Sequence, residues 1–161
     1  MIRPALPADF EGLWPIVRAV AAEGETYAYP RDLGKAEARR LWMQAPRRTF
    51  VAEEDGRIVG GYYLKTNQPG PGAHVCNCGY LVAPEARGRG LATAMCGHSQ
   101  AEARALGYRA MQFNFVAASN EGAVRLWTKL GFATVGRLPR AFRHPRLGLV
   151  DALVLYKWLG D

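Results

Sequence analysis

The residues best placed to do chemistry lie in the segment 82–92, between a predicted strand and a predicted long helix. A helix N-terminus presents unpaired backbone N–H groups and the positive end of the helix dipole. Gly88 and Gly90 let the backbone approach an anion closely, and Arg87 and Arg89 add positive charge. The segment has neither the Gly-Lys-Ser/Thr of a Walker loop nor a GxGxxG motif. We therefore predict a diphosphate site; the alternative is a tight turn with solvated arginines.

Two asparagines lie in largely apolar strands. Asn77 lies between two cysteines, and Asn114 lies between two phenylalanines, on the strand face that it shares with Gln112. A central strand that is packed on both faces should be apolar, so a polar face there indicates a cavity or a partner. The alternative for each asparagine is a structural one, in which its amide satisfies nearby backbone groups.

Other clusters give weaker signals. His74, Cys76 and Cys78 alternate along one strand face, but structural zinc sites take four ligands from converging elements. We predict no metal. The sequence has 21 basic and 14 acidic residues, a net charge of +7 that favours an anionic partner. The densest basic stretch, 137–146, could bind a phosphate of a cosubstrate, a substrate carboxylate or nucleic acid, or could simply be solvated. Without a nucleic-acid-binding motif, we predict no nucleic-acid partner.

Hydrophobic periodicity and turn signals predict the elements that position these residues. Strands are expected at 2–3, 49–53, 58–66, 74–82, 109–115, 132–138 and 149–158, and helices at 9–22, 35–44, 90–106 and 120–130. Pro15 should kink the first helix or delay its start. Loops are expected at 26–34, 67–72 and 139–148. One β-α-β crossover inside a hairpin-rich sheet predicts a mixed α/β domain that spans residues 1–161.

The chain shows no sign of export or membrane insertion. Its N-terminus lacks a charged segment followed by an apolar run, and no stretch approaches about twenty apolar residues. Three cysteines are an odd number for a disulfide framework. We expect a cytoplasmic protein with reduced thiols and no membrane partner.

Two motifs carry a family resemblance. Arg87-x-x-Gly90-x-Ala92, after Val82-x-Pro84, resembles the acyl-CoA-binding signature of the GCN5-related N-acetyltransferases (GNAT). The second family motif is similar to the run from Asn120 through Trp127 to Phe132. The resemblance implies an α/β fold with a mixed, mostly antiparallel sheet, a central parallel β-α-β crossover and flanking helices. It also implies acetyl-CoA as cosubstrate, a small-molecule amine as acceptor and possible homodimers.

The resemblance also implies roles for individual residues. The backbone at Leu81 and Val82 would hold the pantetheine arm and supply an N–H donor to the developing oxyanion. Asn120 would bond the same arm, and Tyr27 and Tyr29 would line the acceptor pocket. The pyrophosphate would lie on Arg87, Gly88, Arg89, Gly90, Leu91, Ala92 and Thr93. Many relatives have a tyrosine general acid where this chain has Trp127, whose indole cannot act as an acid; packing on the core is the expected role of Trp127.

A narrower resemblance links 67–81, 113–116 and 136–152 to the fungal acetyltransferases that detoxify azetidine-2-carboxylate, a proline analogue. It implies catalytic and substrate-positioning roles for Asn114 and Asn77. The predicted activity is direct attack of an amino-acid-like amine on acetyl-CoA, with a proline analogue as the leading acceptor. Glu23, Glu25, His74 or a water would take the proton. Another toxin such as phosphinothricin is the alternative acceptor. A non-catalytic acyl-CoA-binding module and a nucleic-acid-binding domain are the alternative functions.

Overall fold

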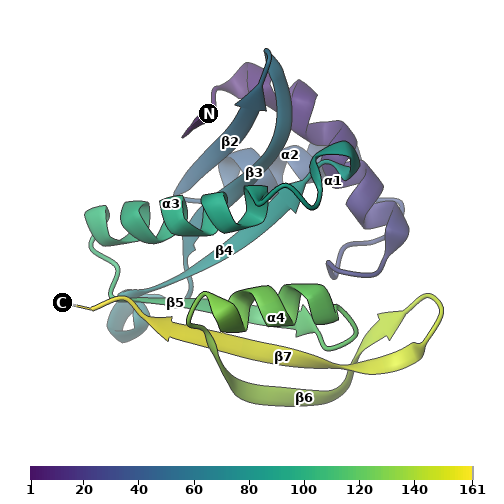
Figure 1. The fold of residues 1–161 in the computed structure, drawn as a ribbon, viewed down its shortest axis with the longest axis vertical. Helices are drawn as coiled ribbons and strands as arrows, with labels where there is room; N and C mark the ends of the chain where they lie inside the picture. The colour runs from purple at the N-terminus through teal and green to yellow at the C-terminus, as the bar shows by residue number, and fades with distance from the viewer. Residues whose placement is uncertain (161) are drawn as a thin grey trace.

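The computed structural model describes residues 1–160, which form a seven-stranded sheet in the order β1-β2-β3-β4-β5-β7-β6 (Figure 1). The strands are β1 (Ile2–Pro4), β2 (Arg48–Glu54), β3 (Arg57–Thr66), β4 (Val75–Val82), β5 (Ala110–Ala117), β6 (Ala133–His144) and β7 (Gly148–Trp158). The β4–β5 pair is parallel and the other pairs are antiparallel. The predicted mixed sheet with a parallel crossover is confirmed.

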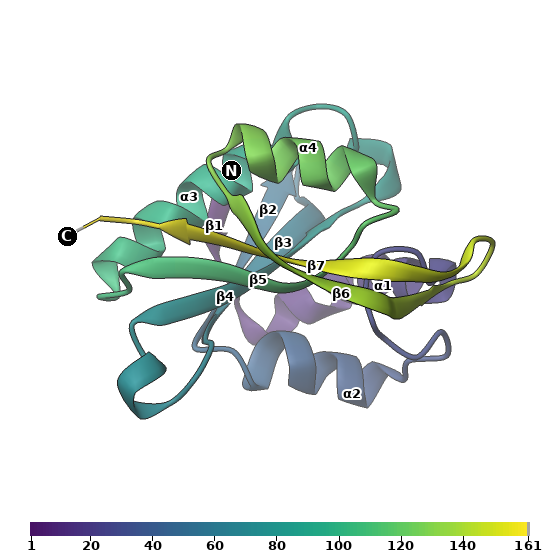
Figure 2. The same cartoon turned by 90° about the horizontal axis from the view of Figure 1, so that it is seen from below.

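Helices cover both faces of this sheet. They are α1 (Phe10–Glu23), α2 (Lys35–Arg39, continued by a π-type turn over Arg40–Gln44), α3 (Leu91–Ala105) and α4 (Glu121–Lys129). Figure 2 shows α3 and α4 over one face and α1 and α2 over the other. α1 starts at Phe10 and runs through Pro15, so the proline does not delay the helix. Within residues 1–160, none of the helices is long and apolar enough to cross a bilayer.

The core follows from the alternation of side chains along β3 and β4. Tyr62 and Tyr80 lie on the α3 face, where their rings are 5.8 Å apart. Tyr63 lies on the opposite face, where its ring meets the edge of buried Trp42 at 4.9 Å. The amphipathic face of α1 is buried against that second face, with Leu13 fully buried. The sheet therefore has an apolar layer on each side.

The parallel β4–β5 pairing is short and then opens. It covers three residue pairs and ends with Asn77 opposite Gln112. β4 continues to Val82 in partnership with β3, while β5 pairs onward with β7. The side-chain amide of Asn77 donates to the Gln112 carbonyl at 2.9 Å, which fixes the point of divergence. Past that point, the facing edges of the two strands have no strand partner.

The prediction of a loop at 139–148 was wrong. β6 extends through His144, so only residues 145–147 connect it to β7. The register shifts between Leu138 and Phe142, where Arg140 has a φ of +52°. The Asp151 carboxylate accepts from the Arg140 backbone N–H at 3.0 Å. This bulge lets the strand continue through a charged stretch that contains a proline.

Candidate active site

A cleft of about 600 Å³ lies where β4 and β5 diverge. Its lining comes from the end of α1, the α1–α2 loop, β3, β4, β5, the start of α3 and α4. Figure 1 shows how these elements are arranged. The predicted site residues that line it are Tyr27, Tyr29, Asn77, Leu81, Val82, Arg87, Ala92, Asn114 and Asn120. The predicted site residues outside the lining are Gly88, Arg89, Gly90, Leu91 and Thr93. The structure thus brings together residues from five separate parts of the sequence.

The start of α3 lies at one end of this cleft. Gly88 and Gly90 have φ of +74° and +79°, a left-handed conformation that favours glycine. No side chain caps the helix, and its first hydrogen bond runs from the Ala94 N–H to the Gly90 carbonyl at 3.0 Å. The N–H groups of residues 91–93 therefore have no partner in the helix. This arrangement fits a phosphate group.

The two arginines of the same turn have different environments. Arg87 lines the cleft and lies 3.6 Å from the Glu23 carboxylate. Arg89 instead pairs at 3.0 Å with Glu54, near the β2–β3 turn, and lies outside the cleft lining. Arg87 is therefore the better placed of the two cations to meet a ligand in the cleft.

The edge of β4 that faces the cleft carries backbone groups turned toward β5. The Tyr27 hydroxyl donates to the Tyr80 carbonyl at 2.9 Å, and burial raises the pKa of Tyr27 well above its ordinary value. Because peptide groups alternate in direction along a strand, the Val82 N–H faces the same side as Tyr80. Leu81 and Val82 both line the cleft. This edge can donate a backbone hydrogen bond to a bound oxygen.

Carboxamides form a chain at the point of divergence. Asn77 is buried and bonds the Gln112 carbonyl, as described above. The Gln112 side chain donates to the Asn114 oxygen at 2.9 Å. The Asn114 amide then donates to the Asn67 oxygen at 2.7 Å. The chain links β4, β5 and the loop after β3, so Asn77 has a structural contact and both predicted asparagines also line the cleft.

Aromatic rings from the α1–α2 loop and β3 line another part of the cleft. Tyr27 and Tyr29 stack with their centroids 5.0 Å apart, and the Trp42 indole N–H donates to the Tyr29 hydroxyl at 3.1 Å. Burial raises the pKa of Tyr29 to about 12, so its hydroxyl stays protonated. Tyr63 lies against Gly79, where a Cβ would be 2.6 Å from the ring. Gly79 is thus required for the position of the Tyr63 ring.

Sequence reasoning missed Tyr63 and Lys65, which both line the cleft. They lie on one face of β3, opposite Gly79 and Asn77 in the antiparallel register. No signal in the sequence pointed to them, because their place in the site depends on the β3–β4 register.

The α4 side of the cleft contains Asn120 and Trp127. The Asn120 side chain caps α4 by accepting from the Ala123 N–H at 3.4 Å. Trp127 is buried, with its ring 5.1 Å from Tyr80 and 5.0 Å from Phe113. Packing on the core is thus an observed role of Trp127, which also lines the cleft.

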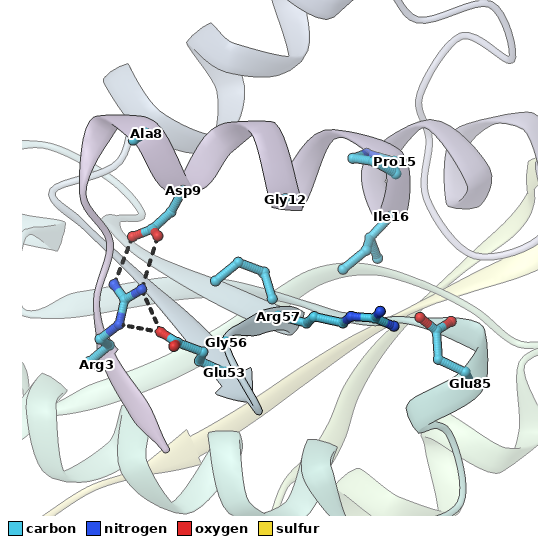
Figure 3. Close-up of a pocket in the computed structure, with 11 residues that line it drawn as sticks. Arg3, Ala8, Asp9, Gly12, Pro15, Ile16, Glu53, Gly56, Arg57 and Glu85 are labelled. Carbon is cyan, nitrogen blue, oxygen red and sulfur yellow. Dashed lines mark hydrogen bonds and ion pairs between the residues drawn. The ribbon is translucent and has the colours of Figure 1, made fainter.

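Other candidate groups lie outside the cleft. His74 is exposed and is not part of the lining. Within residues 1–160, His, Cys, Asp and Glu side chains form no group of three or more that could hold a metal ion. A second groove runs beside α1 (Figure 3), where Arg3 bridges Asp9 and Glu53 at 2.7 and 2.6 Å. Arg3, Asp9 and Glu53 are paired with one another, and we assign the groove no chemistry.

Comparison with known proteins places the chain among acetyltransferases. A family model described as the acetyltransferase (GNAT) family matches residues 14–132. The chain is 35% identical over 98 residues to N-acetyltransferase aca1 of Schizosaccharomyces pombe, covering 60% of this chain and 47% of aca1. The chain thus spans less than half the length of its first curated relatives.

Solved structures share the whole fold. A GCN5-related N-acetyltransferase from Kribbella flavida is 42% identical, with a TM-score of 0.93 over 98% of this chain and 96% of that one. A phosphinothricin acetyltransferase from Sinorhizobium meliloti, solved in complex with AcCoA, is 21% identical, with a TM-score of 0.87 over 99% and 88% of the two chains. At that identity, the second likeness shows the fold alone.

Proposed function

The chain belongs to the GNAT family of acetyltransferases, and we propose that it transfers an acetyl group from acetyl-CoA to the amine of a small amino-acid-like substrate. The observation that carries the proposal is the cleft at the β4–β5 divergence, which has at one end an uncapped helix start that suits a phosphate, and which polar and aromatic side chains also line. Two substrates can thus meet between the strands.

The residues at the α3 end fit the cosubstrate. The free N–H groups of residues 91–93 and the Arg87 guanidinium suit its pyrophosphate. The unpaired edge of β4 at Leu81 and Val82 suits the amides of its pantetheine arm, with Asn120 on the opposite wall. When bound there, acetyl-CoA supplies the acetyl group as a thioester.

We assign charge stabilisation to the backbone of β4. The Val82 N–H faces the cleft and can donate to an oxygen that becomes negative during acyl transfer. The amide chain through Asn77 and Asn114 would hold the acceptor beside it. Trp127 can donate a hydrogen bond but not a proton at neutral pH, so no proton transfer is assigned to it.

The side chains that line the cleft favour direct attack by the amine over an acyl-enzyme intermediate. Cys78 lines the cleft, but burial raises the pKa of its thiol well above its ordinary value, which keeps it in the poorly nucleophilic protonated form. An acyl-enzyme is therefore not part of the proposal. Glu23 and Glu25 line the cleft and are candidates to take the amine proton; His74 lies outside it.

A proline-like cyclic amino acid is the proposed acceptor, on the likeness of 67–81 and 113–116 to the fungal proline-analogue enzymes. The chain is also 35% identical over 98 residues to a fungal N-acetyltransferase, aca1, whereas its likeness to a phosphinothricin acetyltransferase shows only the fold. The test is a screen of amines with acetyl-CoA, including azetidine-2-carboxylate, proline and phosphinothricin, with release of the CoA thiol as the readout. If the protein binds acetyl-CoA but releases no thiol with any amine, the proposed enzymatic activity is refuted and the protein is a non-catalytic acyl-CoA-binding module.

A further inference from the structure

We propose that Lys65 binds the carboxylate of the acceptor, so that the cleft selects amino acids over amines that lack an acid group. The proposal deepens the proposed function and rests on it. Lys65 lines the cleft at the point of divergence and belongs to neither motif that suggested the family.

The charges of the cleft lining favour an anionic acceptor at this point. The charged side chains among the lining residues are Glu23, Glu25, Lys65 and Arg87. Glu23 lies 3.6 Å from Arg87, and Glu25 lies 3.1 Å from Arg146 on the β6–β7 hairpin. Within residues 1–160, Lys65 has no carboxylate within 4.0 Å. The cation that still lacks an anionic partner is therefore Lys65.

The environment of Lys65 leaves its N–H groups available. Its Nζ lies 5.3 Å from the centroid of the Tyr63 ring. A cation–π contact holds an ammonium without using a hydrogen-bond acceptor, and an ammonium has three donors. Tyr63 thus holds the charge at the cleft wall while the donors remain free for a ligand.

Amide donors surround the same point. Lys65 lies opposite Asn77 in the β3–β4 register, and Asn77 lies opposite Gln112 in the β4–β5 register, so the three share one sheet face. The Asn77 amide spends one N–H on the Gln112 carbonyl, and the Asn114 amide spends one on Asn67. Each of these two amides has a second N–H. A carboxylate can accept a charge-assisted hydrogen bond from the Lys65 ammonium and further hydrogen bonds from these amides.

The test compares each amino acid with the amine that lacks its carboxylate: azetidine-2-carboxylate with azetidine, proline with pyrrolidine, and alanine with ethylamine. Parent, Lys65→Met and Lys65→Arg proteins are assayed for kcat/KM by thiol release. Lys129→Met is the matched control, because Lys129 is exposed at the end of α4 and lies outside the cleft. Losing a charge-assisted hydrogen bond should lower kcat/KM about 10-fold for the amino acid, mainly through KM.

Lys65→Met should leave kcat/KM for the matched amine within about 2-fold of the parent, and Lys65→Arg should restore most of the activity on the amino acid. Equal losses on amino acid and amine, or an equal loss in Lys129→Met, would overturn the carboxylate role. If the parent acetylates no amine, the proposed function fails, and calorimetric titration with the amino acids then decides the Lys65 proposal. Binding that Lys65→Met weakens supports it; equal binding or none overturns it.

Discussion

Replacing Gly79 by alanine should damage both the stability of the protein and its acceptor site, because the Tyr63 ring occupies the space of the missing side chain. A Cβ at position 79 would lie 2.6 Å from Tyr63 Cε1 and 2.8 Å from Cζ, where ordinary contact begins at 3.4 Å. The ring must therefore move by about 0.8 Å (3.4 − 2.6). It is 9% exposed and its centroid lies 4.9 Å from that of Trp42, so it cannot simply swing into solvent.

Overpacking of this kind costs about 1–3 kcal/mol. For a chain of 161 residues, that corresponds to a fall in Tm of roughly 2–12 °C. The ring wall of the cleft also moves, so KM for the acceptor should rise while the Kd of acetyl-CoA, which occupies the α3 end in our proposal, stays unchanged. Urea denaturation measures the free energy of unfolding and thermal denaturation the Tm. Steady-state kinetics gives KM, and calorimetry gives the Kd of acetyl-CoA.

A double-mutant cycle isolates the cause. In a Tyr63→Leu background the ring is absent, so the cost of Gly79→Ala should fall to within about 0.5 kcal/mol of zero. The same cost in both backgrounds would refute the argument that Gly79 exists to accommodate Tyr63.

Four further outcomes are expected. Gly90→Val forces a φ of +79° on a β-branched residue at the start of α3, and should weaken acetyl-CoA binding at least 10-fold by calorimetry; an unchanged Kd counts against the phosphate site. Asn114→Ala should lower kcat at least 10-fold with little change in the Kd of acetyl-CoA, and equal kcat would exclude a role in turnover. Gly97→Ala should raise the free energy of unfolding by about 0.5–1 kcal/mol in urea, because Gly97 lies inside α3 with open space around its missing Cβ. The Arg3 hydrogen bond lowers the pKa of Asp9 below its ordinary value, so this carboxylate stabilises the fold above about pH 4 and the benefit is lost as pH falls through the folded-state pKa. The Asp9→Asn variant should therefore be less stable than the parent at pH 7, by about 1 kcal/mol, and this difference should shrink as the pH falls below about 4; a constant difference would contradict this.

The elements of the fold could be predicted because each carries its own local signal. The apolar stripe of α1 is readable within a dozen residues, and so are the glycines that start α3. The Asp-Gly pair at 55–56, which connects β2 and β3, is a local turn signal of the same kind. β6 was cut short because its continuation depends on Asp151, a residue on the next strand that stabilises the bulge at Arg140. Judged from neighbouring residues alone, a proline within a basic stretch predicts a loop.

The same distinction applies to the site. Asn77 and Asn114 were visible as polar residues in apolar strands, and both line the cleft. Lys65 was not visible, because its importance depends on which residue of β4 lies opposite it. The Arg89 side chain lies outside the cleft lining and pairs with Glu54, which is 35 positions away in the chain. Contacts that depend on register or on distant partners cannot be read from spacing alone.

Because the parallel pairing of β4 with β5 is short, the stability of the folded chain depends on whether a ligand is bound. Past Asn77 and Gln112, two strand edges face each other with no partner strand, and any molecule whose amides pair with them binds the folded chain and not the unfolded one. Ligand at 100 times its Kd adds about 2.7 kcal/mol to the free energy of unfolding. A chain with that dependence is most open to proteolysis when the ligand is scarce. With acetyl-CoA as the ligand, as proposed, the abundance of the protein would follow the supply of acetyl-CoA.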